Sequence, residues 1–258
     1  KIPLKKYGKV KMIFKFAGRI AFLINIYHYE KGNALFTGLI VTLVLSSFAS
    51  AYSQECSGSK FSIGSDFSSS YIWRGTKYGS GPAVQPSMKY SSSWLTVGAW
   101  GSFDFSGYQE ADLFLSFALP AGISLGITDY YYPGLKYSDY SEASGSHAFE
   151  LNAGFTAGGF NLAANYIINE AGGVGSSGGD KYFQAGYSFK SFNVFLGAGD
   201  GWHTFDPESG QDKFAVCNLG IGTSRIITVT ETFNIPVAGQ LIFNPDKNQM
   251  FFVVMLTL

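Results

Sequence analysis

The stretch KFSIGSDFSSSYIWRGTKYGSGPAVQP, residues 60–86, indicates the fold of most of the chain. Its first half alternates apolar with polar residues and then reaches Arg74-Gly75, where glycine permits a turn. A second extended segment begins at Pro82-Ala83. We therefore expect two neighbouring strands, 60–74 and 82–91, joined by a loop.

The same period of two continues to the end of the sequence. Further segments that alternate apolar with polar or small residues are 94–105, 110–119, 122–132, 147–157, 160–168, 180–189, 192–199, 213–229, 233–243 and 249–258. Most have a length that suits a transmembrane β-strand of ~9–11 residues. Past residue 60, no segment sustains the helical period of 3.6. The pattern predicts an all-β chain of about twelve strands.

The connections between the expected strands alternate between short and long. Short turns such as Ser92-Ser93 and Gly158-Gly159 follow the even-numbered strands, whereas longer segments such as 133–146 and 169–179 follow odd-numbered ones. Short turns then lie at one end and long loops at the other, as in bacterial outer-membrane barrels. A soluble β-sandwich is the alternative, but its exterior would need more charge than 14% charged residues supply.

We therefore predict a transmembrane antiparallel up-and-down β-barrel for residues 60–258, surrounded by outer-membrane lipid, with both termini periplasmic. The tenth strand is ended before Glu231, because a charge facing lipid is costly. Pro236 cannot donate to a ladder, so we expect a β-bulge there. We expect the barrel-assembly machinery to recognise the apolar C-terminal strand, which ends at Leu258.

Residues 1–51 differ from the rest of the chain in charge. They carry eight Lys or Arg and one acidic residue, whereas residues 52–258 have a net charge of −7. The apolar run Ala34–Leu45 and the small residues up to Ala51 complete the pattern of a secretory signal peptide. We expect cleavage after Ala51 or a few residues later, with residues 52–59 as a short periplasmic lead-in. A membrane anchor is the alternative.

Residues that carry enzyme or metal chemistry are scarce. Cys56 and Cys217 fall in different parts of the expected structure, so we expect two free thiols and no metal site. Ser146-His147 with Glu150 could be drawn into a lipid hydrolase site, but no nucleophile motif surrounds them. We expect no cofactor and no enzyme activity. The acidic barrel segment offers no basic patch for nucleic acid.

A resemblance to a known family is carried by Ser65-Asp66, by Tyr71-Ile72-Trp73-Arg74-Gly75 and by Pro82-Ala83-Val84-Gln85-Pro86. These residues resemble the opening of the TorF family of small Gram-negative outer-membrane porins. The stretch 235–245 and the apolar ending look like the closing hairpin of Bacteroidetes-type barrels. The resemblance implies a porin-like barrel and names no solute.

Strand parity separates lipid-facing from lumen-facing candidates. We expect Tyr71 and Trp73 to face lipid in an aromatic girdle at the outer end of the first strand. The inward-facing polar residues, candidates for solute selectivity, are Asp66, Arg74, Asp104, Asp112, Glu150, Asn152, Asn161, Asn165 and Gln184. Trp100 and Phe114 share the inward face.

A barrel of twelve strands has a narrow interior, so the lumen is either packed and hydrogen-bonded or a small pore. Inward acids outnumber inward bases, which favours cations. The sequence thus predicts a porin-like barrel for passive passage or binding of small polar solutes. The alternative is a non-conducting barrel that serves as structure or as partner of another envelope protein.

Overall fold

The computed structural model describes residues 9–16, 20–27, 29–31, 34–36, 60–231 and 233–258. The chain divides into two compact units, residues 1–54 and 55–258. In the first unit β1 (Lys9–Phe16) pairs antiparallel with β2 (Ile20–Tyr27), and β3 (Tyr29–Lys31) pairs with β4 (Ala34–Phe36). The predicted cleavage position after Ala51 lies outside the described residues.

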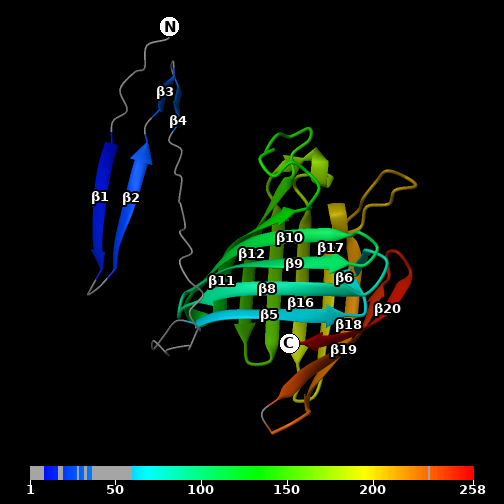
Figure 1. Ribbon diagram of the computed structural model, residues 1–258. Helices are drawn as coiled ribbons and strands as arrows, with labels where there is room; N and C mark the ends of the chain where they lie inside the picture. Colours follow the sequence, from blue (N-terminus) through cyan, green and yellow to red (C-terminus); the bar gives the residue numbers. More distant parts are fainter. Residues whose placement is uncertain (1–8, 17–19, 28, 32–33, 37–59, 232) are drawn as a thin grey trace. The chain divides into compact units, whose positions relative to one another are not determined.

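In the second unit, twelve strands form a closed antiparallel barrel in which β20 (red) returns to β5 (cyan), as Figure 1 shows. In order around the barrel they are β5 (Lys60–Ser68), β8 (Ala83–Ser91), β9 (Leu95–Asp104), β10 (Gln109–Ala118), β11 (Ile123–Tyr131), β12 (His147–Ala157), β13 (Phe160–Ile167), β16 (Lys181–Ser188), β17 (Asn193–Gly199), β18 (Ala215–Thr228), β19 (Asn234–Asn244) and β20 (Gln249–Thr257). The predicted fold class, an all-β up-and-down barrel of twelve strands, is confirmed.

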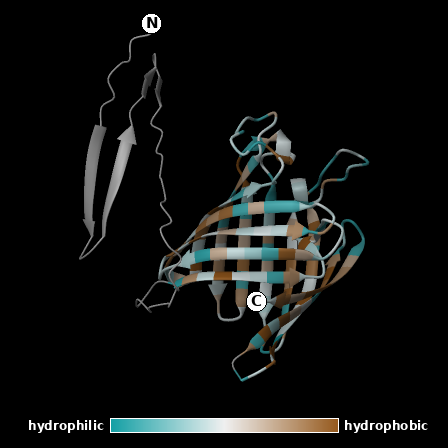
Figure 2. Cartoon of the chain, in the orientation of Figure 1, coloured by the Kyte–Doolittle hydropathy of each residue, from teal (hydrophilic) through white to brown (hydrophobic). Residues whose placement is uncertain are grey.

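Alternation along the strands gives the barrel an apolar outer surface and a more polar interior. Ile63 is 75% exposed and Leu151 is 47% exposed, whereas Glu150 and Asp112, on the other face of their strands, are buried. Figure 2 shows apolar (brown) bands alternating with paler or polar (teal) bands along single strands. An exterior with so many exposed apolar side chains suits contact with hydrocarbon better than contact with water.

The predicted alternation of connections holds in part: those after β5, β11, β13 and β17 are long, but those after β9 and β19 are as short as the turns at the other end. Short turns include η1 (Pro120–Gly122), and long loops carry β14 (Glu170–Ala171), η2 (Gly172–Val174), β15 (Ser176–Ser177) and η3 (Gly201–His203). Glu231 lies between the ends of β18 and β19, outside both strands, as predicted. In the part of the chain that the structure describes, no helix is long and apolar enough to cross a membrane.

The first predicted strand, 60–74, is wrong beyond Ser68. After Ser68 the chain leaves the barrel wall, and β6 (Tyr71–Trp73) and β7 (Thr76–Tyr78) form a separate two-stranded hairpin. Arg74 and Gly75 at its tip have φ values of 50° and 83°, which suit a two-residue type I′ turn. We call residues 69–82 the lumen hairpin, because its tip lies inside the barrel.

The inward course of the hairpin corrects the assignment of Tyr71 and Trp73 to a lipid-facing girdle. Tyr71 is only 8% exposed, and Trp73 packs against the buried cluster that includes Tyr130 and Ile167. Strand parity gave the wrong side because it assumed an unbroken strand through Ser68-Ser69-Ser70. Once the chain turns away from the wall, the side chains no longer alternate between lipid and lumen.

The expected bulge at Pro236 is absent as well. Pro236 pairs with Ile226 in an unbroken register, and the pairing of β19 with β20 begins only at Val237. Pro236 therefore lies beyond the ladder between β19 and β20 and removes no hydrogen bond from it. The register shift lies instead between Gly197 and Ala198 of β17.

Candidate functional site

The backbone at the tip of the lumen hairpin lies against β19 and β18, the second and third strands from β5 around the closed barrel. Asn244 Nδ2 of β19 donates to the Gly75 carbonyl oxygen at 3.0 Å. A Cβ atom at Gly75 would collide with the carbonyl oxygen of Cys217 on β18. Lys247 Nζ lies 3.5 Å from Thr76 Oγ1. The tip thus touches the wall through its own backbone, which only glycine permits at this position.

Arg74 makes the main side-chain contact of the tip, a bidentate ion pair with Glu150 of β12. Nη1 lies 2.5 Å from Glu150 Oε2, and Nη2 lies 2.8 Å from Oε1. The guanidinium also lies over the rings of Trp73 and Tyr182, with Cζ 4.5 Å from each ring centroid. A planar guanidinium suits both kinds of contact. The buried carboxylate is thereby matched by a charge held in fixed geometry.

A hydrogen-bond network extends from Glu150 along the inner wall. Tyr130 Oη donates to Glu150 Oε1 at 3.0 Å, and Asn152 Nδ2 donates to the same oxygen at 2.6 Å. Asn152 Nδ2 also lies 3.0 Å from Asn165 Oδ1. Four residues that strand parity placed in the lumen, Arg74 among them, therefore form one connected group.

His203, in the loop between β17 and β18, packs against the same guanidinium. Its Nε2 accepts from Arg74 Nη1 at 3.4 Å, and its ring centroid lies 4.9 Å from that of Tyr182. Burial, and then the positive charges of Arg74 and Lys247, lower the pKa of His203 to about 2. The ring is therefore neutral at ordinary pH. Sequence analysis missed it, because a loop histidine has no strand parity.

A second buried group, the acid pair Glu110 and Asp112, lies on the inner face of β10. Tyr108 Oη donates to Glu110 Oε2 at 2.5 Å, and Tyr71 Oη donates to Oε1 at 3.4 Å. Asp112 is 6% exposed, and its Oδ1 has no hydrogen-bond partner among the described residues. Asp112 was expected in the lumen. Glu110 was missed, although it has the same parity as Asp112.

The contacts of Gln184, Asp66 and Asn161, also predicted to face the lumen, lie elsewhere along the wall than those of Glu150. Gln184 Oε1 accepts from Tyr182 Oη at 2.7 Å, and Asp66 Oδ1 accepts from Thr257 Oγ1 at 2.6 Å beside the closure of the barrel. The Asn161 side chain occupies the space that a Cβ atom at Gly186 would need. Gln184 is joined through Tyr182 to the ring contact of Arg74, whereas Asp66 and Asn161 make wall contacts outside that network.

Asp104, the last residue of β9, lies at the rim of the barrel. Its oxygens accept from the backbone N–H groups of Ser80, Ser106 and Tyr108 at 2.8–2.9 Å. Ser80 belongs to the lumen hairpin, so the carboxylate joins that segment to the loop after β9. Parity alone does not distinguish the lumen from the rim above it.

Residues of the lumen hairpin line two cavities. The outer vestibule has a volume of about 860 Å³ and is lined by Tyr78 of the hairpin and by residues of the long loops. The inner chamber, of about 250 Å³, is lined by Ile72 and Arg74 of the hairpin together with polar side chains such as Gln184 and Asn218. The hairpin therefore contributes side chains to both cavities.

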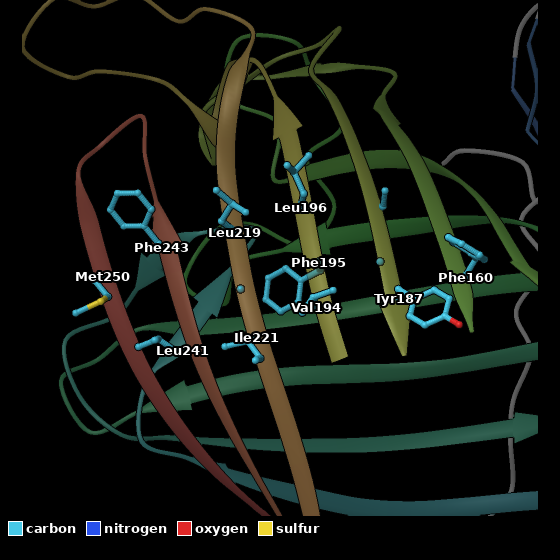
Figure 3. Close-up of a pocket in the computed structure, with 13 residues that line it drawn as sticks. Phe160, Tyr187, Val194, Phe195, Leu196, Leu219, Ile221, Leu241, Phe243 and Met250 are labelled. Carbon is cyan, nitrogen blue, oxygen red and sulfur yellow. The ribbon is translucent and has the colours of Figure 1, made fainter. Parts of the chain in front are cut away.

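A further groove, of about 590 Å³, lies on the outer surface across β16–β20 and is almost entirely apolar. Figure 3 shows side chains from neighbouring strands around it, including Leu196, Leu219, Leu241 and Phe243. These side chains have the outward parity of the apolar belt and lie away from the polar groups of the lumen. The groove is therefore a feature of the lipid-facing surface and not of the candidate site.

The grouping considered for a lipid hydrolase has no catalytic geometry. Nδ1 of His147 lies 2.9 Å from Asp129, but Nε2 lies 2.6 Å from the Tyr137 carbonyl oxygen. Ser146 Oγ donates to backbone carbonyl groups and not to His147. Glu150 is bound to Arg74 in the lumen. Serine and histidine therefore form no nucleophile–base pair here.

Metal ligands are not clustered either: the described residues contain no group of three or more His, Cys, Asp or Glu that could hold a metal ion. Cys217 is a buried free thiol. Its predicted independence from Cys56 is not tested, because Cys56 lies outside the described residues.

Comparisons with known proteins place the chain in a family. No curated protein matches it. Among solved structures, a triple mutant of the Rh. blastica porin matches with 14% identity, a TM-score of 0.35, and coverage of 68% of this chain and 55% of that chain. The chain thus spans about half the length of that porin. Residues 53–236 match the family described as "Bacterial protein of unknown function (Gcw_chp)", and the chain therefore belongs to the Gcw_chp family.

Proposed function

We propose that the protein is a porin-like barrel of the Gram-negative outer membrane that binds small polar solutes and lets them pass when the lumen hairpin yields. The carrying observation is that this one short element lines two cavities that also have polar linings. Tyr78 lines the outer vestibule, whereas Ile72 and Arg74 line the inner chamber. A solute that crosses the barrel has to pass the contact between Arg74 and Glu150.

The proposed location is supported by a closed barrel, which leaves no sheet edge unpaired in lipid, and by the exposed apolar belt. Periplasmic termini, a cleaved signal peptide and recognition of β20 by the assembly machinery belong to the same proposal. Membership of the TorF family also stays a prediction, which the Gcw_chp match does not test.

A preference for cations follows from the charges inside the barrel. Asp66, Glu110, Asp112 and Glu150 lie on inner faces of strands, while Arg74 is the base that the hairpin places among them. Acidic pore linings attract cations and repel anions. Because Arg74 is itself part of the hairpin, displacement of the hairpin would leave the acids without this counter-charge.

Conductance in planar bilayers tests the proposal. The hairpin-free variant replaces residues 69–82 by Asn-Gly, which can join the paired residues Ser68 and Ala83 as a type I′ turn. We expect small or rare conductance steps from wild type and larger, cation-selective steps from the variant, seen as a shift of reversal potential in a KCl gradient.

A control variant lacks Pro207–Ser209 from the exposed loop after η3, which lies outside the lumen. Its conductance should match wild type. Silence of the folded, hairpin-free barrel would overturn the porin proposal. It would favour the second candidate, a non-conducting structural barrel. The bidentate contact between Arg74 and Glu150, which holds the hairpin in place, supports that candidate.

A further inference from the structure

Aromatic rings form much of the inner wall of the outer vestibule. Tyr78 comes from the lumen hairpin, Tyr132 follows β11, and Trp202 lies in η3. The Trp202 indole is fixed, because Nε1 donates to the Gly175 carbonyl oxygen at 2.8 Å. Fixed ring faces around an open cavity favour a ligand with a positive centre, since the face of a ring carries negative charge.

The charged groups of the vestibule are also biased toward a cation. Lys181 is paired with Asp200 at 3.2 Å, so these two charges largely offset each other. Asp212 and Lys247 also line the vestibule, so its lining holds three acids and two bases. Asp180 is 7% exposed, and its carboxylate accepts from the Trp202 backbone N–H at 2.9 Å.

Tyr78 and Tyr132 form the tyrosine wall of the vestibule, and the acid pair Glu110–Asp112 lies behind it. Tyr108, which donates to Glu110, packs against both vestibule tyrosines, with centroid distances of 5.8 Å to Tyr78 and 6.2 Å to Tyr132. Burial, and next the charge of Glu110, raise the pKa of the Tyr132 hydroxyl. The field of the acid pair thus reaches the wall of the vestibule.

The acid pair carries one negative charge that no base of the hairpin offsets. Glu110 and Asp112 are buried together and hydrogen-bonded to each other, so they share one proton, because two like charges this close do not both ionise. Arg74, the base at the tip of the lumen hairpin, is committed to Glu150. The charge of the pair lies behind Tyr108 and attracts a cation in the vestibule.

We propose that the outer vestibule is a binding site for organic ammonium ions, with the tyrosine wall contacting the cation and the acid pair supplying attraction from behind. This deepens the proposed function by naming a solute class, and it rests on that function only for the fate of the solute. Binding itself requires no conduction.

Isothermal titration of the folded protein in detergent micelles, with choline as probe, tests the site. The matched neutral probe is 3,3-dimethylbutan-1-ol, which has the same shape without the charge. We expect choline to bind at least about tenfold more tightly than the alcohol, because a desolvated cation–π contact and the carboxylate field act on the charge alone. Equal affinities, or no choline binding at 50 mM as an order-of-magnitude ceiling, would overturn the proposal.

Variants locate the site. Asp180→Asn keeps the side-chain shape and should weaken choline binding about fivefold or more. Tyr132→Leu should weaken it roughly threefold. Glu208→Gln, which removes an exposed loop charge that does not line the vestibule, should leave the affinity unchanged.

Folding of each variant is checked by heat-modifiable gel mobility. Unchanged choline affinity in both Asp180→Asn and Tyr132→Leu would contradict the assignment. Titration in micelles involves no transport. Choline binding by a silent barrel would therefore refute the porin function alone, whereas conduction without choline binding would refute the vestibule site alone.

Discussion

Arg74 combines an unfavourable backbone with favourable side-chain contacts. Its φ of 50° costs a residue with a Cβ on the order of 1 kcal/mol. The two hydrogen bonds to Glu150 and the ring contacts with Trp73 and Tyr182 offset that cost. A non-glycine residue stays in this conformation because the side-chain contacts in the lumen stabilise the fold by more free energy than the backbone strain costs.

The neutral ring of His203 makes stability depend on pH. Its folded pKa of about 2 lies below the unfolded value near ~6.5. As the pH falls, the unfolded chain therefore binds a proton first. The contribution of His203 is fully present above about pH 6.5 and declines toward pH 2, by up to about 1.4 kcal/mol per pH unit. Urea unfolding in lipid vesicles at pH 7.5 to 4.5, within this window, measures the slope.

The comparison for that experiment is His203→Phe, which keeps a ring between Trp73 and Tyr182. Carboxylates titrate in both proteins, so the difference in slope isolates the histidine. We expect a shallower loss of stability with falling pH in the variant. Identical slopes would show that His203 gains protons in the folded barrel as readily as in the unfolded chain.

At the scale of the element, the lumen hairpin is short and makes few ladder bonds of its own. Its β6 and β7 pair over three residues each, and the hairpin gains its position from its tip. Gly75 is the point of closest approach, where the backbone touches Cys217 of β18. An element so short is not stable alone, so contacts with the barrel decide where it lies.

Gly75→Ala should release the hairpin, because the added Cβ meets the Cys217 carbonyl and φ is 83°. Overpacking costs ~1–3 kcal/mol, so trypsin should cut after Arg74 and Lys77 about tenfold faster than in wild type. Mass spectrometry of the fragments gives the rate at each bond.

Gly107→Ala is the matched control, since Gly107 also has positive φ, at 106°, but a Cβ there meets nothing within 4 Å. It carries the backbone strain without the collision. Equal cleavage rates after Arg74 in the two variants would mean that the close contact between Gly75 and the Cys217 carbonyl group does not hold the hairpin in place.

At the scale of the whole molecule, the barrel turns its apolar side chains outward, the reverse of a soluble sandwich. Leu151 near the middle of β12 is 47% exposed, while its neighbour Glu150 is buried at 1% exposure. In water this arrangement would be unfavourable. Inside a bilayer it removes apolar surface from water on every strand at once.

Leu151→Lys therefore distinguishes a membrane-embedded barrel from a soluble one. In lipid vesicles the charge at mid-strand should destabilise the fold by ~2–4 kcal/mol, measured by urea titration. For an exposed site in water the change would stay within about 0.5 kcal/mol.

Phe105→Lys serves as the reference, because Phe105 is exposed in a loop beyond the end of β9. We expect little change there. A small effect at both positions would argue against burial of the outer belt in lipid.

Much of the barrel could be predicted from the sequence, because the alternation of apolar and polar residues within each wall strand distinguishes its outer face from its inner face. Alternation placed Asp112 and Glu150 inside and Ile63 and Leu151 outside, and the lipid cost of Glu231 located a turn. These inferences need only local period and the polarity of each side chain. The register to a neighbouring strand follows once short turns connect them.

Only the tertiary structure decided what fills the lumen. The break after Ser68 leaves no mark in the alternation, and the partners of Arg74 lie on strands distant in sequence. Whether the segment after Ser68 continues along lipid or turns inward depends on the free energy of pairing its guanidinium with Glu150 across the barrel. The opening stretch 60–86 thus determined a hairpin by its sequence, while its inward course was decided by contacts that exist only after the barrel has closed.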